Sequence, residues 1–255
     1  MVTAGVDVGA KTIKIIILRN GRIIGQTIIP AGYDVRESMK AAWADVLSKA
    51  GVQLNQIDRI ISTGAGRKEV AEANDQITEV SAVARGAIAL DLRIRTVVDV
   101  GAEEGRAIQI NAVGQVLDFA INEKCAAGTG AFTEAMARAL EVTIEQLGPL
   151  SLQSTNAVAI NAQCAVFAES ELVTLVHSKT PKPDMARAVH DAIADRIVSM
   201  VRRVGMEKEV MLVGGVARNI GFVDSLKREL DTEIFIPETP ETVSAYGAAL
   251  LATGK

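Results

Sequence analysis

Short apolar runs open the chain, and a second set of the same kind begins near residue 95. The runs span about residues 3–8, 12–18, 22–29, 95–100, 106–111 and 115–120. Each run has the length and the Val/Ile-rich composition of a buried strand, and Gly-containing turns separate the members of each set. The pattern predicts two three-stranded meanders that are copies of one another.

Helical spacing of apolar residues follows each set of strands. The expected helices span about 36–50, 81–90, 129–141, 165–177, 181–204, 220–230 and 242–252, and two further strands span 57–62 and 209–213. The longest helix carries an apolar stripe at helical spacing, formed by Val189, Ile193, Ile197, Met200 and Val204. Groups of strands that alternate with helices indicate the α/β class.

The two meanders share a motif at the end of their first strand. Gly5–Gly9 (Gly-Val-Asp-Val-Gly) recurs as Val97–Gly101 (Val-Val-Asp-Val-Gly), and Lys14 and Arg106 occupy matching places in the strands that follow. Such a duplication predicts two half-domains that face each other across a cleft, the layout with which actin-like (ribonuclease H-like) ATPases hold a nucleotide. We expect a first half over residues 1–93 and a second over 94–241, with the C-terminal helix, 242–254, packed back on the first.

Composition narrows the class of protein. Hydrophobic residues make up 49% of the chain but aromatic residues only 3%, so the core is built mainly from Ala, Val, Ile and Leu. The net charge of -4 argues against a nucleic-acid-binding face. No apolar run approaches the roughly 20 residues that span a bilayer. With two Cys and no room for a signal peptide before the first strand, the sequence predicts a cytoplasmic protein without a structural disulfide.

The two Asp-x-Gly turns are candidate phosphate-binding turns. Such a turn needs glycines, which let backbone N–H groups approach the phosphate, and a nearby cation. The two turns and the strand after the first supply Asp7, Gly9, Ala10, Lys11, Thr12, Lys14, Asp99, Gly101, Ala102, Glu103 and Glu104. The first turn is basic and the second acidic. We therefore expect the first to grip the phosphates, while Asp99, Glu103 or Glu104 orients Mg²⁺-bound or attacking water.

A third glycine turn, Gly214-Gly215, follows a predicted strand and leads into a helix, which suits an adenosine or phosphate contact. A single Asp-x-Gly is more often an ordinary hairpin turn. Two copies in register and a third turn nevertheless favour nucleotide binding. The candidate catalytic residues are Asp7, Asp99 and Glu103, and the candidate nucleotide contacts are Gly9, Ala10, Lys11, Thr12, Lys14, Gly101, Ala102, Gly214 and Gly215.

Each of the two cysteines precedes a predicted helix. Cys125 lies before the small-residue segment 126–130, and Cys164 lies directly before the helix at 165–177. The positive end of a helix stabilises a thiolate or an anionic ligand. Spacing alone favours two inert buried thiols. Two thiolates cannot complete a four-Cys iron–sulfur site, so a cluster held by these residues must bridge two chains.

Five segments occur in an order that resembles one family of ATPases. They are Val6–Gly9, Asp99–Gly101, Cys125–Gly130, Cys164–Glu171 and Gly214–Asn219. Together they resemble the family that contains the activators of 2-hydroxyacyl-CoA dehydratases and the ATPase subunits of benzoyl-CoA reductase, over nearly the whole chain. Actin-like kinases and filament proteins share the phosphate turns but not the two Cys segments.

The resemblance implies an actin-like fold, ATP or ADP bound with Mg²⁺, and one [4Fe–4S] cluster shared between two subunits, with Cys125 and Cys164 as this chain's ligands. It also implies that ATP hydrolysis drives a low-potential electron from ferredoxin or flavodoxin towards a catalytic reductase or dehydratase subunit. Activators commonly carry Gly-Gly-Gln-Asp where this chain has Gly101–Glu104, and a hydroxyl residue where it has Ala10. The Ala-Glu-Glu variant favours a benzoyl-CoA reductase-type subunit, paired across the cluster with a paralogous ATPase subunit.

Three other functions stay open on the sequence. A homodimeric dehydratase activator would share the cluster between two copies of this chain. A small-molecule kinase would need an acidic base and an acceptor pocket, and would work without iron. An actin-like filament protein would form nucleotide-dependent polymers and would not need its Cys. His177 and His190 have no acidic or Cys partner at ligand spacing, so we expect both to be structural.

Overall fold

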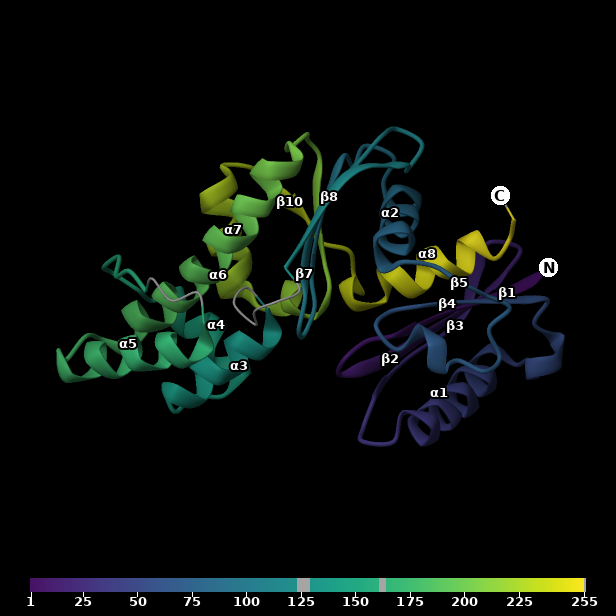
Figure 1. Cartoon of the computed structure of the whole chain (residues 1–255), viewed down its shortest axis with the longest axis horizontal. Helices are drawn as coiled ribbons and strands as arrows, with labels where there is room; N and C mark the ends of the chain where they lie inside the picture. Colours follow the sequence, from purple (N-terminus) through teal and green to yellow (C-terminus); the bar gives the residue numbers. More distant parts are fainter. Residues whose placement is uncertain (123–128, 161–163, 255) are drawn as a thin grey trace. The chain divides into compact units, whose positions relative to one another are not determined.

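The computed structural model describes residues 1–122, 129–160 and 164–254 (Figure 1). They form two compact units. The first unit comprises Met1–Val97, Ile110–Leu117 and Pro237–Lys255, and the second comprises Val98–Gln109 and Asp118–Ile236. Each unit is built on one five-stranded sheet with helices, which confirms the predicted α/β class.

The sheet of the first unit contains the predicted first meander. Its strands are β1 (Val2–Val8), β2 (Thr12–Arg19), β3 (Arg22–Pro30), β4 (Arg59–Thr63) and β5 (Asp75–Gln76). Their order across the sheet is β3-β2-β1-β4-β5. The meander strands are antiparallel, whereas β4 runs parallel to β1 and β5 parallel to β4.

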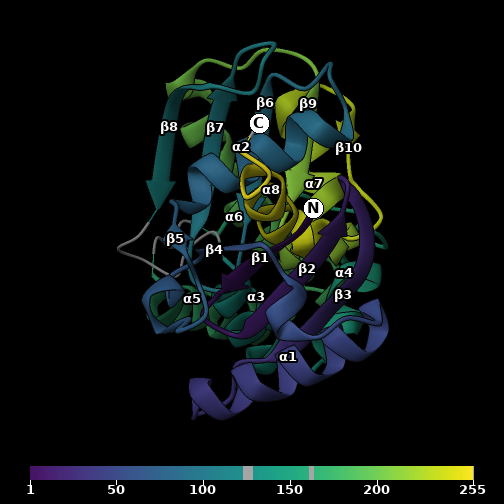
Figure 2. The same ribbon diagram turned by 90° about the vertical axis from the view of Figure 1, so that its right-hand side faces the viewer.

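The sheet of the second unit repeats this arrangement. Its strands are β6 (Thr96–Val100), β7 (Gly105–Ile110), β8 (Val116–Asn122), β9 (Val210–Val213) and β10 (Ile234–Phe235). Read from β8, the order β8-β7-β6-β9-β10 matches that of the first sheet strand for strand (Figure 2). The duplication therefore extends beyond the meander, since β9 takes the place of β4 and β10 that of β5.

The helices agree with the apolar periodicity, with one exception. They are α1 (Val35–Ala50), α2 (Glu79–Leu90), α3 (Gly130–Ala139), α4 (Ile144–Ser151), α5 (Ala165–His177), α6 (Lys182–Val204), α7 (Ile220–Leu230) and α8 (Val243–Leu251). The sequence did not predict α4, because Gly148-Pro149 argues against a helix. A capping box between Thr143 and Gln146 starts it, and Leu147 is fully buried. Within the described ranges, no helix has the length and apolar character that crossing a membrane requires.

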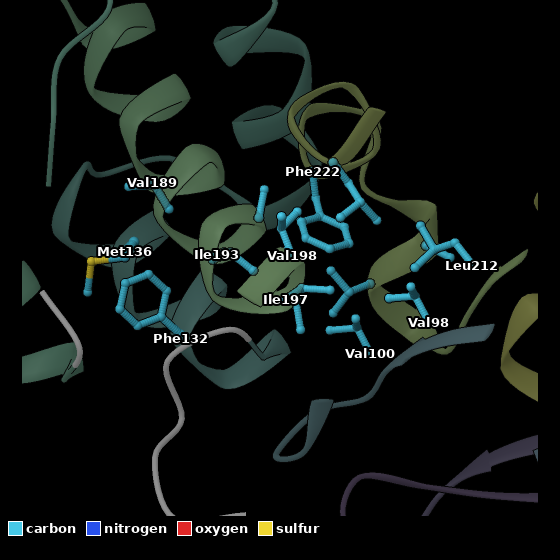
Figure 3. Packing of buried hydrophobic residues seen from close by; sticks show 14 of the residues in the cluster. Val98, Val100, Phe132, Met136, Val189, Ile193, Ile197, Val198, Leu212 and Phe222 are labelled. Carbon is cyan, nitrogen blue, oxygen red and sulfur yellow. The ribbon is translucent and has the colours of Figure 1, made fainter. Parts of the chain in front are cut away.

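The core of the second unit lies along α6. All five residues of the predicted stripe are buried and belong to one cluster with strand residues of β6 and β9. Figure 3 shows Val189, Ile193 and Ile197 in this cluster, together with Phe132 of α3 and Phe222 of α7. Aliphatic side chains fill most of this cluster, as the low aromatic content requires. The long helix thus fixes the strand ends of β6 and β9 from which the glycine turns of this unit emerge.

In the first unit, β2 is buried on both faces. Ile13, Ile15 and Ile17 pack towards α1, whereas Ile16 and Leu18 pack towards α8. Glycines allow α8 to approach its neighbours closely. A Cβ on Gly5 of β1 would lie 2.0 Å from the carbonyl oxygen of Ala245, and one on Gly247 would lie 1.8 Å from that of Ala82 in α2. Helix α8 is therefore held between β1 and α2 by backbone contacts that no larger residue allows.

This packing predicts that Gly247→Ala destabilises the chain by about 3 kcal/mol or more, because the added methyl meets helix backbone that cannot rotate away. Urea unfolding monitored by circular dichroism measures the change. Gly215→Ala is the matched control. A Cβ there meets no atom within 4 Å, so its unfolding midpoint should stay at the wild-type value. Equal midpoints for the two variants would contradict the close approach of α8 and α2.

Candidate functional site

A buried ion pair closes the first hairpin of the first unit. Asp7 at the end of β1 lies opposite Lys14 in the antiparallel register of β2. The Lys14 Nζ is 3.1 Å from the Asp7 Oδ2, and the hydroxyl of Ser244 on α8 donates to the same oxygen at 2.8 Å. The other oxygen, Oδ1, is buried and accepts no hydrogen bond from any residue that the structure describes. The carboxylate is thus fixed through one oxygen and has its second oxygen available.

The second unit carries the same pair. Arg106 Nη1 donates to Asp99 Oδ2 at 2.9 Å, and both side chains are largely buried. The second terminal nitrogen of Arg106 pairs with Glu104. Glu103 is exposed. The sequence suggested Lys14 as a charge partner for phosphate, but its ammonium group is directed to Asp7, as Arg106 is to Asp99.

A glycine in a left-handed conformation lies against each of these aspartates. Gly64 follows β4 with φ 93°, and Gly214 follows β9 with φ 87°. A Cβ on Gly64 would lie 2.5 Å from Asp7 Oδ1, and one on Gly214 would lie 2.8 Å from Asp99 Oδ1. Sequence reasoning found Gly214 but missed Gly64. The sequence could have indicated Gly64 through the Gly-x-Gly of residues 64–66, which follows a predicted buried strand as Gly214-Gly215 does.

The two Asp-x-Gly turns have the same backbone geometry. The Gly9 N–H donates to Thr12 O at 3.0 Å, and the Gly101 N–H donates to Glu104 O at 2.9 Å. Ala10 and Lys11 are exposed at the tip of the first turn. The structure therefore gathers Asp7, Gly9 and Lys14 in the first unit, and Asp99, Gly101 and Gly214 in the second.

The third turn leads into α7. Gly214 has φ 87° and ψ 171°, a region that is essentially restricted to glycine. A short helical turn over Gly215–Arg218 follows, and Asn219 caps α7 by accepting from the N–H groups of Gly221 and Phe222 at 3.0 and 3.3 Å. The glycine turn and the helix N-terminus thus form one continuous segment, as anion-binding turns do.

Cys164 is partly exposed and directly precedes α5. Its side chain makes no capping hydrogen bond within the described ranges, and its place at the positive end of α5 favours an anionic sulfur. Cys125 lies outside the described residues. The thiol of Cys164 is suited to bind a metal as a thiolate. Asp7 Oδ1, which accepts no hydrogen bond from a described residue, and the glycines that lie against the two aspartates fit a phosphate-bound Mg²⁺.

The model of the BadF/BadG/BcrA/BcrD ATPase family matches residues 4–252. The 2-hydroxyisocaproyl-CoA dehydratase activator of Clostridioides difficile is 37% identical over 253 residues, which cover 99% of this chain and 95% of that relative. One of the benzoyl-CoA reductase subunits of Thauera aromatica is 28% identical over 98% of this chain and 92% of that relative.

Two of the solved structures that match this chain over its whole length are also similar to it in sequence. The (R)-2-hydroxyglutaryl-CoA dehydratase component A of Acidaminococcus fermentans has a TM-score of 0.95 at 34% identity and 98% coverage of that chain. The activator of the 2-hydroxyisocaproyl-CoA dehydratase from Clostridium difficile, solved with bound ADPNP, has a TM-score of 0.91 at 36% identity and 95% coverage of that chain. The predicted actin-like fold is confirmed.

The buried pair predicts a strong coupling between Asp7 and Lys14. Lys14→Met leaves a buried carboxylate without its cation and should lower the free energy of unfolding by about 3 kcal/mol, whereas Asp7→Asn combined with Lys14→Met removes both charges and should recover most of that loss. Urea unfolding of the single and double variants gives the coupling energy. Lys49→Met, which breaks an exposed pair with Asp45, should cost about 0.5 kcal/mol or less. Additive effects of the two substitutions would contradict the pair.

Proposed function

Because the chain belongs to the BadF/BadG/BcrA/BcrD ATPase family, we propose that it is a homodimeric, ATP-hydrolysing activator of a 2-hydroxyacyl-CoA dehydratase. The 37% identity to a dehydratase activator over nearly the full length supports this assignment. The reductase relative, at 28%, supports a benzoyl-CoA reductase partner less well. The preference drawn from residues 102–104 is therefore reversed, and we treat those residues as a variation within the activators.

The observation that carries the proposal is the repeated carboxylate corner, in which an aspartate is fixed by a cation and lies against a glycine. In the first unit, Asp7, the Gly9–Thr12 turn and Lys14 would bind the phosphates and their Mg²⁺. In the second, Asp99 and Glu103 would orient the Mg²⁺-bound or attacking water, beside Gly101 and Ala102. Gly214 and Gly215 would contact the adenosine. The ADPNP bound by one structural relative supports a nucleotide at these turns.

Cys125 and Cys164 from each of two chains would supply the four thiolates of a [4Fe–4S] cluster. The cluster, when bound, provides a low-potential one-electron centre. Cys164 suits this role because it is partly exposed and lies at the positive end of α5, which favours an anionic sulfur. The electron would come from ferredoxin or flavodoxin and pass to the dehydratase.

Two backbone hydrogen bonds link the second phosphate turn to the segment that follows Cys125. The N–H of Gly130 donates to Gly101 O at 2.9 Å, and that of Ala131 donates to Ala102 O at 2.8 Å. Gly130 and Ala131 are the first residues of α3. A change in the turn on hydrolysis would thus be passed directly to the start of α3 and to the Cys125 segment before it. We propose this link as the coupling between nucleotide and cluster.

The cluster assignment predicts that the chain, purified without oxygen, is a dimer with about four iron and four sulfide per pair of chains. Cys125→Ser and Cys164→Ser should each abolish iron binding, while the chain still binds nucleotide. Ser170→Ala, an exposed change on α5, should keep the iron. Iron that survives Cys164→Ser would contradict the proposal. A chain that binds iron only with a second, related ATPase chain would support the benzoyl-CoA reductase-type complex instead.

The third turn predicts that Gly214→Ala weakens ATP binding at least about tenfold, because alanine is excluded from this backbone conformation and its methyl would lie 2.3 Å from Val100 O. Calorimetric titration with ADPNP and Mg²⁺ measures the affinity. Gly51→Asn is the control, since Gly51 ends α1 in the left-handed conformation that asparagine tolerates. Unchanged affinity in Gly214→Ala would remove this turn from the nucleotide site.

A further inference from the structure

His190 on α6 is completely buried in the second unit and takes no part in the chemistry proposed above. Its Nδ1 lies 2.8 Å from the carbonyl oxygen of Ala186, one helical turn earlier. A carbonyl can only accept, so Nδ1 carries the ring proton and Nε2 presents a lone pair. Nε2 is buried and no described residue meets it with the full geometry of a hydrogen bond, although the side chain of Asn219 lies close enough to raise the pKa of the ring. The ring therefore contains a buried acceptor that is not fully used.

Asn219, which caps α7 directly after the Gly214–Arg218 turn, contains the complementary group. Its Oδ1 is occupied by the N–H groups of Gly221 and Phe222, which fixes the orientation of the amide. Its Nδ2 is buried and has no acceptor in the described part of the chain. A buried donor and a buried acceptor are each costly when they stay unpaired.

Glycines bring these two groups together where α4, α6 and α7 meet. A Cβ on Gly221 would lie 2.8 Å from Cε1 and 2.9 Å from Nδ1 of His190, and a Cβ on Gly148 of α4 would lie 2.7 Å from Asn219 Oδ1. Only glycine at these positions lets the imidazole and the amide occupy one small polar space. The side chain of Asn219 is near enough to the His190 ring to raise its pKa.

Burial keeps this histidine neutral, because it lowers the pKa of His190 to about 4. The charged groups that act on the ring are Asp191 on α6 and Asp224 on α7. Both are bound to Arg228, and Asp191 also accepts from Ser225 and Arg187. These contacts neutralise the carboxylates, so they do not recruit a proton to Nε2 at neutral pH.

We propose that Asn219 Nδ2 donates a hydrogen bond to His190 Nε2 when nucleotide occupies the Gly214–Gly215 turn, which makes His190 the positioning residue for that turn. The inference rests on the proposed function. Hydrogen bonds from the Ala217 N–H to Gly214 O and from the Asn219 N–H to Val216 O connect the turn to Asn219, so a ligand that shifts the turn also shifts the amide. His190, on a helix of 23 residues, is the fixed partner.

The direct test is ¹⁵N NMR of the full-length chain, with the histidine ring nitrogens observed before and after addition of ADP and Mg²⁺. We expect Nδ1 of His190 to be protonated in both states and Nε2 to shift in the direction of a hydrogen-bonded acceptor when ADP binds. A proton on Nε2, or an Nε2 resonance that ADP leaves in place, overturns the inference.

Asn219→Asp tests the same bond, because aspartate keeps the capping oxygen and loses the donor. We expect ADP to bind about 3- to 10-fold more weakly, as for one lost hydrogen bond, with kcat at saturating ATP within about twofold of wild type. His190→Leu should behave alike, and His177→Leu, an exposed change on α5, should match wild type. Wild-type affinity in Asn219→Asp overturns this inference alone. A wild-type chain that binds no nucleotide overturns the proposed function as well.

Stability gives a second readout that a misfolded variant cannot imitate. An unfolded chain protonates His190 near pH 6.5, whereas the folded chain holds it neutral down to about pH 4. The folded state therefore loses stability as the pH falls from about 6.5 to about 4. Wild type and His177→Leu should both show this loss, and His190→Leu should show less of it. The same loss in His190→Leu would contradict a neutral, buried acceptor.

Discussion

A buried carboxylate, fixed by a cation on the neighbouring strand, organises each half of this protein. Asp7 with Lys14, and Asp99 with Arg106, close the first hairpin of each sheet. The pair holds one carboxylate oxygen and leaves the aspartate at the end of its strand, beside the Gly9 or Gly101 turn. It also requires a glycine directly after the neighbouring strand, β4 or β9, since any side chain on Gly64 or Gly214 would meet the carboxylate. Fold and candidate chemistry thus depend on the same contact.

The two ion pairs differ in the further residues that contact them. Ser244 of α8 donates to Asp7, so the first pair depends on the packing of the C-terminal helix against β1. In the second pair, Arg106 instead forms a further ion pair with Glu104 of the adjacent turn. That turn also accepts the first N–H groups of α3, which follows the Cys125 segment. The turn of the second half is therefore hydrogen-bonded to the start of α3.

Much of the fold could be predicted because the strands are apolar over their whole length and the helices carry clear stripes. Helix α4 was not predicted because Gly148-Pro149 argues against a helix, although a capping box precedes them. Strands β5 and β10 were not predicted because two residues are too few to show a periodicity. Gly64 was not predicted because it does not belong to an Asp-x-Gly motif, and because its role depends on Asp7, which lies 57 positions away in the chain. The partners of Lys14 and Arg106 could not be predicted either, since an aspartate in register competes with a phosphate for the same cation.

The partner enzyme could not be assigned from a single short motif. Three residues of one turn favoured a reductase-type chain, but similarity over 253 residues favours a dehydratase activator. The central proposal is that the chain binds one nucleotide and that this binding requires both Asp7 and Asp99. Calorimetric titration of the anaerobically purified chain with ADPNP and Mg²⁺ tests it most directly. One nucleotide per chain, lost on either Asp7→Asn or Asp99→Asn, is the predicted result. Two nucleotides per chain, each lost with only one of the substitutions, would contradict it.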